Sequence, residues 1–105
     1  VANQWNVNNN CALVVGATVP QELADVRTLV GDMTIICPGI GFQQKGVPLD
    51  KQVEQTVKAA INSRQRGFVI NASRSVLYAS GGEDFADAAR AEVLKMNGLV
   101  AQYRN

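Results

Sequence analysis

The chain contains three short, largely apolar runs that end in glycine, proline or small polar residues. They occupy positions 12–15, 34–37 and 67–71. The first run, ALVV before Gly16, shows no polar alternation, which is typical of a strand buried on both faces of a parallel sheet. We therefore predict three β-strands, the first of them buried on both faces.

Between and after these runs, apolar residues recur at the spacing of an amphipathic helix. Charged residues among them, such as Arg27, Lys51 and Lys58, are expected to face solvent. We therefore predict a helix after each strand, the last being the longest. The apolar faces consist of Leu23, Val26 and Val30 in the first helix, Val53, Val57, Ala60 and Ile61 in the second, and Phe85, Ala89, Val93, Met96, Val100 and Tyr103 in the third.

Residues that favour helix starts precede each predicted helix. Positions 18–21, TVPQ, match a capping box with proline in the first turn. Asp50 is suited to cap the second helix, and positions 80–83, SGGE, form a second capping box before the third. These residues place the three helix starts after Thr18, Asp50 and Ser80.

Alternating strands and helices predict βαβ crossovers and a parallel sheet, and therefore an α/β fold. A (β/α)₈ barrel contains eight such units in roughly 250 residues. The 105 residues here hold three units, and three units alone leave the sheet edges and faces uncovered. We therefore interpret residues 1–105 as the last three or so units of a TIM barrel. A small free-standing layer of helices on a three- or four-stranded sheet is the alternative.

The start of the chain also suggests a segment of a longer polypeptide. It begins Val1-Ala2-Asn3, without methionine, in what resembles the end of a helix. Proteolytic processing would produce the same start.

The composition narrows the classes of partner. The chain is 47% hydrophobic and 18% charged, as expected of a packed globular domain, and contains no apolar run of the roughly 20 residues that span a membrane. Its net charge is +1, with lysine and arginine scattered singly, so it lacks the basic stripe of a nucleic-acid-binding protein. We expect neither a membrane nor a nucleic acid as partner.

The cysteine and histidine content limits the possible chemistry. We expect Cys11 and Cys37 to be reduced thiols that act as small apolar residues, in a cytoplasmic protein. The sequence has no histidine, which excludes Ser-His-Asp and Cys-His catalysis within the chain and argues against a zinc site. The carboxylates fall on predicted helix exteriors and helix starts. We therefore assign no catalytic residue and no metal ligand.

The strongest functional signal is the glycine-rich segment 38–46, PGIGFQQKG, directly after the second strand. It is not a dinucleotide-binding motif, because Gln44 stands where the third glycine belongs, nor a Walker loop, because Val47 replaces the lysine. A glycine loop at the carboxyl end of a parallel strand is nonetheless where α/β folds bind ligands. A plain turn is the alternative.

Arg74 follows the third strand and is expected on the same edge of the sheet. Its planar guanidinium suits a phosphate dianion, and the Gln43 amide offers a further N–H to the same anion. The alternatives are a surface ion pair for Arg74 and a solvent-exposed role for Gln43. Because barrels repeatedly bind phosphate with the loops after their last two strands, we predict a shared phosphate site.

Three blocks of sequence then carry a family resemblance. Residues 13–18 (LVVGAT), 38–43 (PGIGFQ) and 70–75 (INASRS, followed by Tyr78-Ala79) resemble the carboxyl-terminal part of the orotidine 5′-phosphate decarboxylase family. The resemblance implies a (β/α)₈ barrel, usually homodimeric, that converts orotidine monophosphate to uridine monophosphate and CO₂ in pyrimidine biosynthesis. It also implies a lyase without metal or organic cofactor.

The resemblance implies roles for individual residues. Gln43 and Arg74 match the family's phosphate-binding glutamine and arginine, with further backbone donors near Ser73. The sequence departs from the family at Phe42 and at Gln44-Lys45, where smaller residues are usual, so Gln43 and Gln44 are able to exchange roles. The positions that match the wall of the nucleotide pocket are Pro38, Ile40 and Gly41.

The family's catalytic lysine and aspartates lie in a D-x-K-x-x-D motif that this chain does not contain. The resemblance therefore implies that these residues supply the phosphate site and not the proton donor, and we expect the 105-residue chain alone to be inactive. The alternatives are a non-enzymatic βα module that binds a phosphorylated ligand, and another phosphate-binding barrel enzyme.

Overall fold

The computed structural model describes residues 2–41 and 46–104. These residues form eight elements of secondary structure that alternate between strands and helices along most of the chain. In order, they are α1 (Ala2–Trp5), β1 (Ala12–Val14), α2 (Pro20–Val30), β2 (Thr34–Pro38), α3 (Leu49–Ala60), β3 (Phe68–Asn71), α4 (Arg74–Leu77) and α5 (Phe85–Arg104).

The strands of the described chain form one parallel sheet in the order β1-β2-β3. Leu13 pairs with Ile35, and Ile35 with Phe68, so the strands run in step from the start of the sheet. At the other end, Pro38 pairs with Asn71. The predicted α/β fold of parallel βα units is confirmed.

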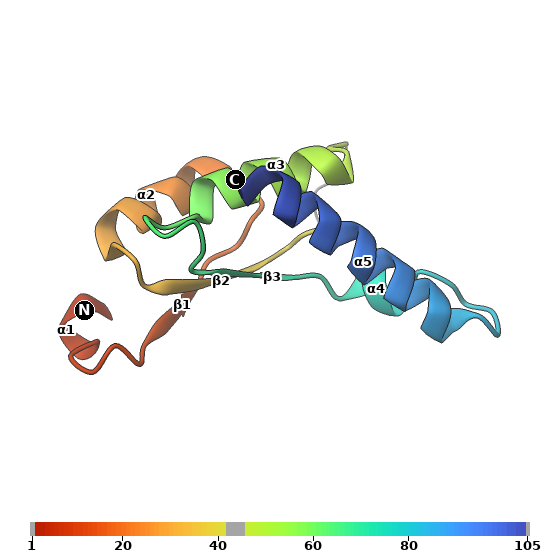
Figure 1. The fold of residues 1–105 in the computed structure, drawn as a ribbon, viewed down its shortest axis with the longest axis horizontal. Helices are drawn as coiled ribbons and strands as arrows, with labels where there is room; N and C mark the ends of the chain where they lie inside the picture. The colour runs from red at the N-terminus through yellow and green to blue at the C-terminus, as the bar shows by residue number, and fades with distance from the viewer. Residues whose placement is uncertain (1, 42–45, 105) are drawn as a thin grey trace.

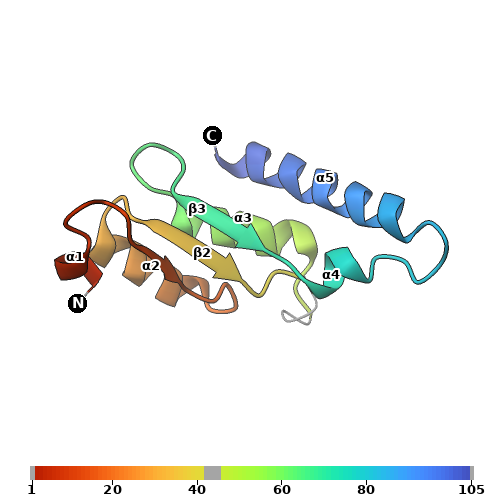
Figure 2. The same ribbon diagram turned by 90° about the horizontal axis from the view of Figure 1, so that it is seen from below.

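The three long helices, α2, α3 and α5, lie on one side of this sheet. Figure 1 shows α2 and α3 above the sheet, and Figure 2 shows α5 alongside β3. The core lies between the sheet and these helices, where side chains of the strands pack against side chains of the helices. Its fully buried members include Leu23, Ile35, Cys37, Val53 and Val57.

No helix of the described chain covers the opposite face of the sheet (Figure 1). Val14, Ile36 and Val69 share this face because they are register partners in adjacent strands. Val14 is 69% exposed and Val69 is 51% exposed. The prediction that the first strand is buried on both faces is therefore wrong for this chain. In a closed barrel this face would line the interior.

The predicted helix caps are only partly correct. Pro20 lies in the first turn of α2, as predicted, but Val19 occupies the cap position and no side chain bonds to it, so the Thr18 capping box is wrong. α3 begins at Leu49, one residue before Asp50. The Asp50 carboxylate instead accepts a hydrogen bond from the Tyr103 hydroxyl at 2.5 Å, which joins α3 to the end of α5.

The third predicted cap is also wrong. The Ser80 Oγ accepts a hydrogen bond from the Gly82 N–H at 3.1 Å and donates to Asp84 at 2.5 Å, and α5 begins only at Phe85. Ser80 thus closes a local turn, because its hydroxyl finds a backbone N–H two residues on. Glu83, the other end of the predicted box, is exposed.

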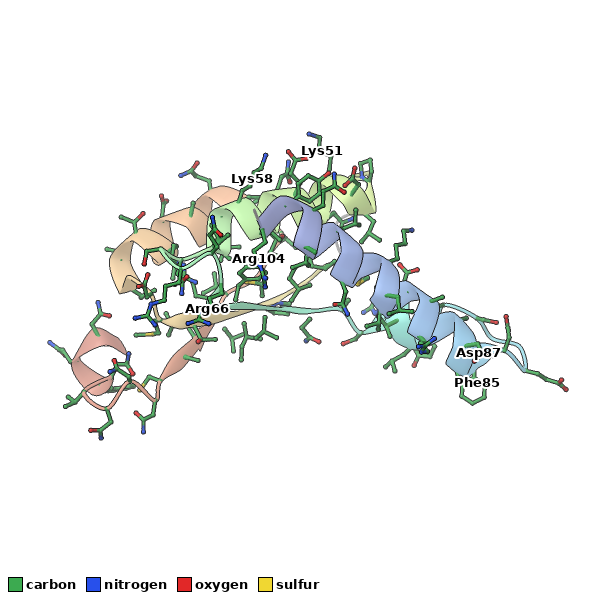
Figure 3. The ribbon with its side chains drawn as sticks, viewed as in Figure 1. Lys51, Lys58, Arg66, Phe85, Asp87 and Arg104 are labelled. Atoms are coloured by element: carbon green, nitrogen blue, oxygen red, sulfur yellow. The ribbon has the colours of Figure 1, made fainter. Side chains whose placement is uncertain are left out.

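The apolar face of α5 reaches the core only along its second half. Met96 is buried, and Val100 and Tyr103 pack against the core. Phe85 is 61% exposed, and Figure 3 shows it at the end of α5 that extends past the sheet. Lys51 and Lys58 project from α3 on the side away from the sheet, as predicted (Figure 3).

The two cysteines are free thiols. Cys37 is a core residue, and burial raises the pKa of its thiol to about 11. Cys11 is partly buried, and its backbone N–H bonds to the Asn6 side chain at 2.9 Å. The prediction that Cys37 acts as a small apolar residue is confirmed.

Arg27 has a structural role that the periodicity did not reveal. Its guanidinium donates to the carbonyl oxygens of Ala60 at 2.6 Å, Gly31 at 2.7 Å, Met33 at 2.5 Å and Gly67 at 2.8 Å. Partial burial lowers the pKa of this guanidinium. Arg27 therefore joins the carboxyl ends of α2 and α3 to the starts of β2 and β3, rather than facing solvent as predicted.

We predict that Arg27→Met lowers the free energy of unfolding by about 2–4 kcal/mol, because it leaves four backbone carbonyls without this donor. Urea denaturation followed by circular dichroism measures the change. Arg90→Met, at an exposed arginine on α5, is the matched control, with an expected change within about 0.5 kcal/mol. Equal losses in the two variants would contradict the role assigned to Arg27.

Candidate phosphate-binding edge of the sheet

The carboxyl ends of the three strands meet at one edge of the sheet. The pairing of Pro38 with Asn71 means that β2 and β3 end side by side, so the segments that follow them leave from the same edge. The Ala17 N–H donates to the Pro38 carbonyl at 2.8 Å, which brings the segment after β1 to this edge as well. This is the edge on which parallel α/β folds place their ligands.

Gly41 and Ser75 bring the segments after β2 and β3 into contact. A Cβ placed on Gly41 would lie 2.7 Å from the Ser75 Oγ and 2.9 Å from its Cβ, so any larger residue there would displace Ser75. The φ of Gly41 is +104°, which L-residues rarely adopt. The Ser75 Oγ is buried and has no hydrogen-bond partner in the described part of the chain. Glycine thus permits close approach of the two segments.

Gln52, in the first turns of α3, is bonded to the glycine loop. Its Oε1 accepts from the Gly41 N–H at 2.7 Å, and its Nε2 donates to the carbonyls of Gly41 at 3.2 Å and Val47 at 2.7 Å. The residue is only 3% exposed. Sequence reasoning missed this residue. The signal in the sequence was that Gln52, a polar residue, directly precedes Val53, which belongs to the predicted apolar face of the helix.

Arg74 and Ser73 lie at this edge and are exposed. Arg74 is the first residue of α4 and the neighbour of Ser75, which touches Gly41. Its guanidinium makes no hydrogen bond or ion pair within residues 2–41 and 46–104, so the surface ion pair weighed as an alternative is not found there. The guanidinium is accessible to a ligand.

The other predicted site residues are placed differently. Gln43, together with the alternative Gln44, lies outside the described residues. Pro38 is partly buried at the end of β2, and its register partner is Asn71. Ile40 is only 4% exposed and belongs to the core between sheet and helices. The structure thus brings Gly41 to the segment that carries Arg74 and directs Ile40 into the core.

Other charged groups with shifted pKa values lie away from this edge. Hydrogen bonds from Ser63 lower the pKa of Asp32, which follows α2 near the opposite ends of the strands. On the outer side of α3, a hydrogen bond from Lys58 lowers the pKa of Glu54. The described residues contain no group of three or more potential metal ligands, and no described helix is long and apolar enough to span a membrane. Arg74, in contrast, is an exposed cation at the edge where β3 ends.

Several curated proteins are similar in sequence to nearly the whole of this chain. An orotidine 5′-phosphate decarboxylase from Azoarcus is 48% identical over 104 residues, covering 99% of this chain and 36% of that protein. The corresponding protein from Janthinobacterium is 47% identical over 103 residues, covering 98% and 36%. The resemblance to orotidine 5′-phosphate decarboxylase is confirmed. The chain spans about a third of the length of these curated relatives, and it matches no protein-family model.

Solved structures with a similar fold include an OMP decarboxylase and a UMP synthase. The OMP decarboxylase of Leishmania donovani matches 93% of this chain with a TM-score of 0.68 and 31% sequence identity, and 34% of that chain is covered. The UMP synthase of the same organism matches with the same TM-score and 32% identity, with 20% of that chain covered. The three βα units correspond to part of a TIM barrel, as predicted.

We predict that Gly41→Ala weakens phosphate binding at this edge, because the new methyl group would displace Ser75 and the segment next to it. Gly46→Ala is the matched control. Gly46 also has a positive φ, of +81°, but a Cβ there meets no atom of the described residues within 4 Å. The measurement is the affinity for uridine monophosphate, by calorimetry on the protein and both variants.

The two variants share the cost of the positive φ, so their difference reports the contact with Ser75. We expect Gly41→Ala to bind about tenfold more weakly than Gly46→Ala, and the additional substitution Ser75→Gly to recover part of the loss. Equal affinities of the two alanine variants would contradict a functional contact between the segments.

Proposed function

We propose that residues 1–105 form the carboxyl-terminal part of an orotidine 5′-phosphate decarboxylase domain, a carboxy-lyase that converts orotidine monophosphate to uridine monophosphate and CO₂ in pyrimidine biosynthesis. Nearly the whole chain aligns with about a third of each curated relative. In this proposal, the chain supplies the site that holds the nucleotide phosphate. The observation that carries the proposal is the close approach of Gly41 to Ser75 at one sheet edge.

The proposed phosphate contacts come from both segments at this edge. The Arg74 guanidinium donates two parallel hydrogen bonds to the dianion, and the Gln43 amide donates another. Backbone N–H groups near Ser73 complete the site. The exposure of Arg74 and its freedom from ion pairs within the described chain support this role, because a guanidinium held by a carboxylate would be less available to a phosphate.

The nucleotide itself is proposed to extend from the phosphate over the adjoining edge of the sheet. Pro38 and Gly41 border the path, since Pro38 ends β2 and Gly41 lies beside Ser75. Ile40 is proposed to support this wall from within the core, because it is almost fully buried. The uncovered sheet face next to Pro38 then faces the interior of the barrel.

The chain's own residues contribute binding energy to the reaction. Contacts with the remote phosphate stabilise the transition state when they are used to position the reacting part of the nucleotide. The proton donor and the carboxylates of the Lys-Asp array come, in this proposal, from the remaining part of the barrel. The reaction uses neither metal nor organic cofactor, and the 105-residue chain alone is expected to show no turnover.

The exposed apolar surface of this chain supports the proposal that it belongs to a larger protein. Val14 and Val69 on the open sheet face, and Phe85 on α5, are all more than half exposed. Exposed apolar area of this kind is usually covered by further chain or by a partner. We propose that the rest of the barrel covers the sheet face, and that the complete protein is a cytoplasmic homodimer.

We predict that Arg74→Ala, in the complete enzyme, raises KM for orotidine monophosphate strongly and lowers kcat/KM by an amount equivalent to a few kcal/mol. The cause is the loss of a charge-assisted, bidentate contact. Steady-state decarboxylation kinetics measure it. Arg66→Ala is the matched control, because Figure 3 shows Arg66 at the start of β3, at the opposite end of that strand from α4.

A comparison of two substrates, with and without the phosphate, distinguishes the loss of a phosphate contact from a general loss of structure. With orotidine, which has no phosphate, we expect Arg74→Ala and the wild-type protein to have equal kcat/KM. A normal KM for orotidine monophosphate in Arg74→Ala would contradict the proposed role of Arg74. An inactive wild-type enzyme would contradict the proposed function as a whole.

A further inference from the structure

We propose that Gln52 is a positioning residue for the phosphate site: its side-chain amide holds the backbone at Gly41 and at Val47, and thereby sets how Gly41 meets the segment that carries Arg74. This inference rests on the proposed function. Gln52 itself is not assigned a contact with the nucleotide.

The hydrogen-bond geometry carries the argument. The amide bonds to both backbone groups of Gly41, accepting from its N–H at 2.7 Å and donating to its carbonyl at 3.2 Å. The same Nε2 donates to the Val47 carbonyl at 2.7 Å. Gly41 and Val47 lie on opposite sides of segment 42–45 in the sequence. One planar group therefore holds the two ends of the segment that carries the predicted phosphate ligand.

The amide is itself held firmly by the helix. Gln52 belongs to α3, and its backbone N–H donates to the Pro48 carbonyl at 3.0 Å, where the loop enters the helix. The next residue, Val53, is fully buried in the core. Because Gln52 is almost fully buried as well, its side chain loses its partners at high cost if the loop moves. The backbone at Gly41 and at Val47 is thus held by a side chain of α3.

The position of Gly41 also affects the segment after β3, which carries Arg74. Gly41, which Gln52 holds, is the residue that fits closely against Ser75, and Ser75 follows Arg74. A shift of Gly41 therefore changes the spacing between the segment that leads to Gln43 and the segment that carries Arg74. Displacements of about 1 Å are enough to reduce catalysis by about 100-fold when they misplace a bound substrate.

The test compares Gln52→Met with Thr56→Val in the complete enzyme. Methionine approximates the length of glutamine but makes none of its hydrogen bonds. Thr56 is the matched control, because it lies one turn further along α3, is fully buried, and its Oγ1 has no partner in the described chain. We expect Gln52→Met to raise KM for orotidine monophosphate about 10- to 100-fold, and Thr56→Val to leave it within about twofold.

Kinetics with orotidine distinguish a role in the phosphate site from a general role in the fold. Since it has no phosphate, kcat/KM for orotidine should be the same in Gln52→Met and the wild-type protein. An equal loss with both substrates would overturn the inference, because it would mean that Gln52 supports the fold in general. A KM for orotidine monophosphate equal to that of Thr56→Val would also overturn it.

Gln52→Glu supplies a second test through its pH dependence. A protonated carboxyl accepts from the Gly41 N–H and donates to one of the two carbonyls, whereas the ionised form presents oxygen to both. We therefore expect KM for orotidine monophosphate in this variant to rise as the pH increases through the carboxyl's pKa, with no such step in the wild-type protein. A pH-independent ratio of the two KM values would overturn the inference.

The experiment also separates this inference from the proposed function. A wild-type enzyme that does not decarboxylate orotidine monophosphate overturns both. An active wild-type enzyme in which Gln52→Met and Thr56→Val behave alike overturns only the role of Gln52.

Discussion

The site depends on the parallel register that pairs Pro38 with Asn71. Because β2 and β3 end together, the segments that follow them leave the sheet from one edge, and Gly41 comes into close contact with Ser75. A different register would separate the glycine loop from Arg74 along the strand direction, by about 3.3 Å for each residue of slip. The pairing is fixed in turn by the burial of Ile35 and Cys37, since a slip of one residue would turn both out of the core.

At the two ends of this sheet, side chains from helices bond to backbone groups of the connecting segments. Arg27 bonds to four carbonyls near the starts of β2 and β3, and Gln52 bonds to Gly41 and Val47 beyond the end of β2. The first group is far from the proposed ligand and serves stability. The second holds the loop that belongs to the proposed phosphate site. This division agrees with the usual barrel arrangement, in which function lies at the carboxyl ends of the strands.

The sequence predicted those features that follow from the spacing of apolar residues. The three strands, the three long helices and the shared edge are correct, because burial of Leu23, Ile35 and Val57 determines them. The caps at Thr18, Asp50 and Ser80 are wrong, since a short polar side chain has several competing partners and tertiary contacts choose among them. Arg27 and Gln52 were missed for a related reason. Their partners are backbone groups up to 40 residues away, and periodicity contains no information about those.

The central claim is that the segments after β2 and β3 bind one phosphate together. A crystal structure of the complete protein with uridine monophosphate tests it most directly. The account predicts that the Gln43 amide nitrogen and the Arg74 guanidinium both lie within about 3 Å of oxygens of the same phosphate. A phosphate bound at another edge of the sheet, or one that contacts only one of these two side chains, would contradict it.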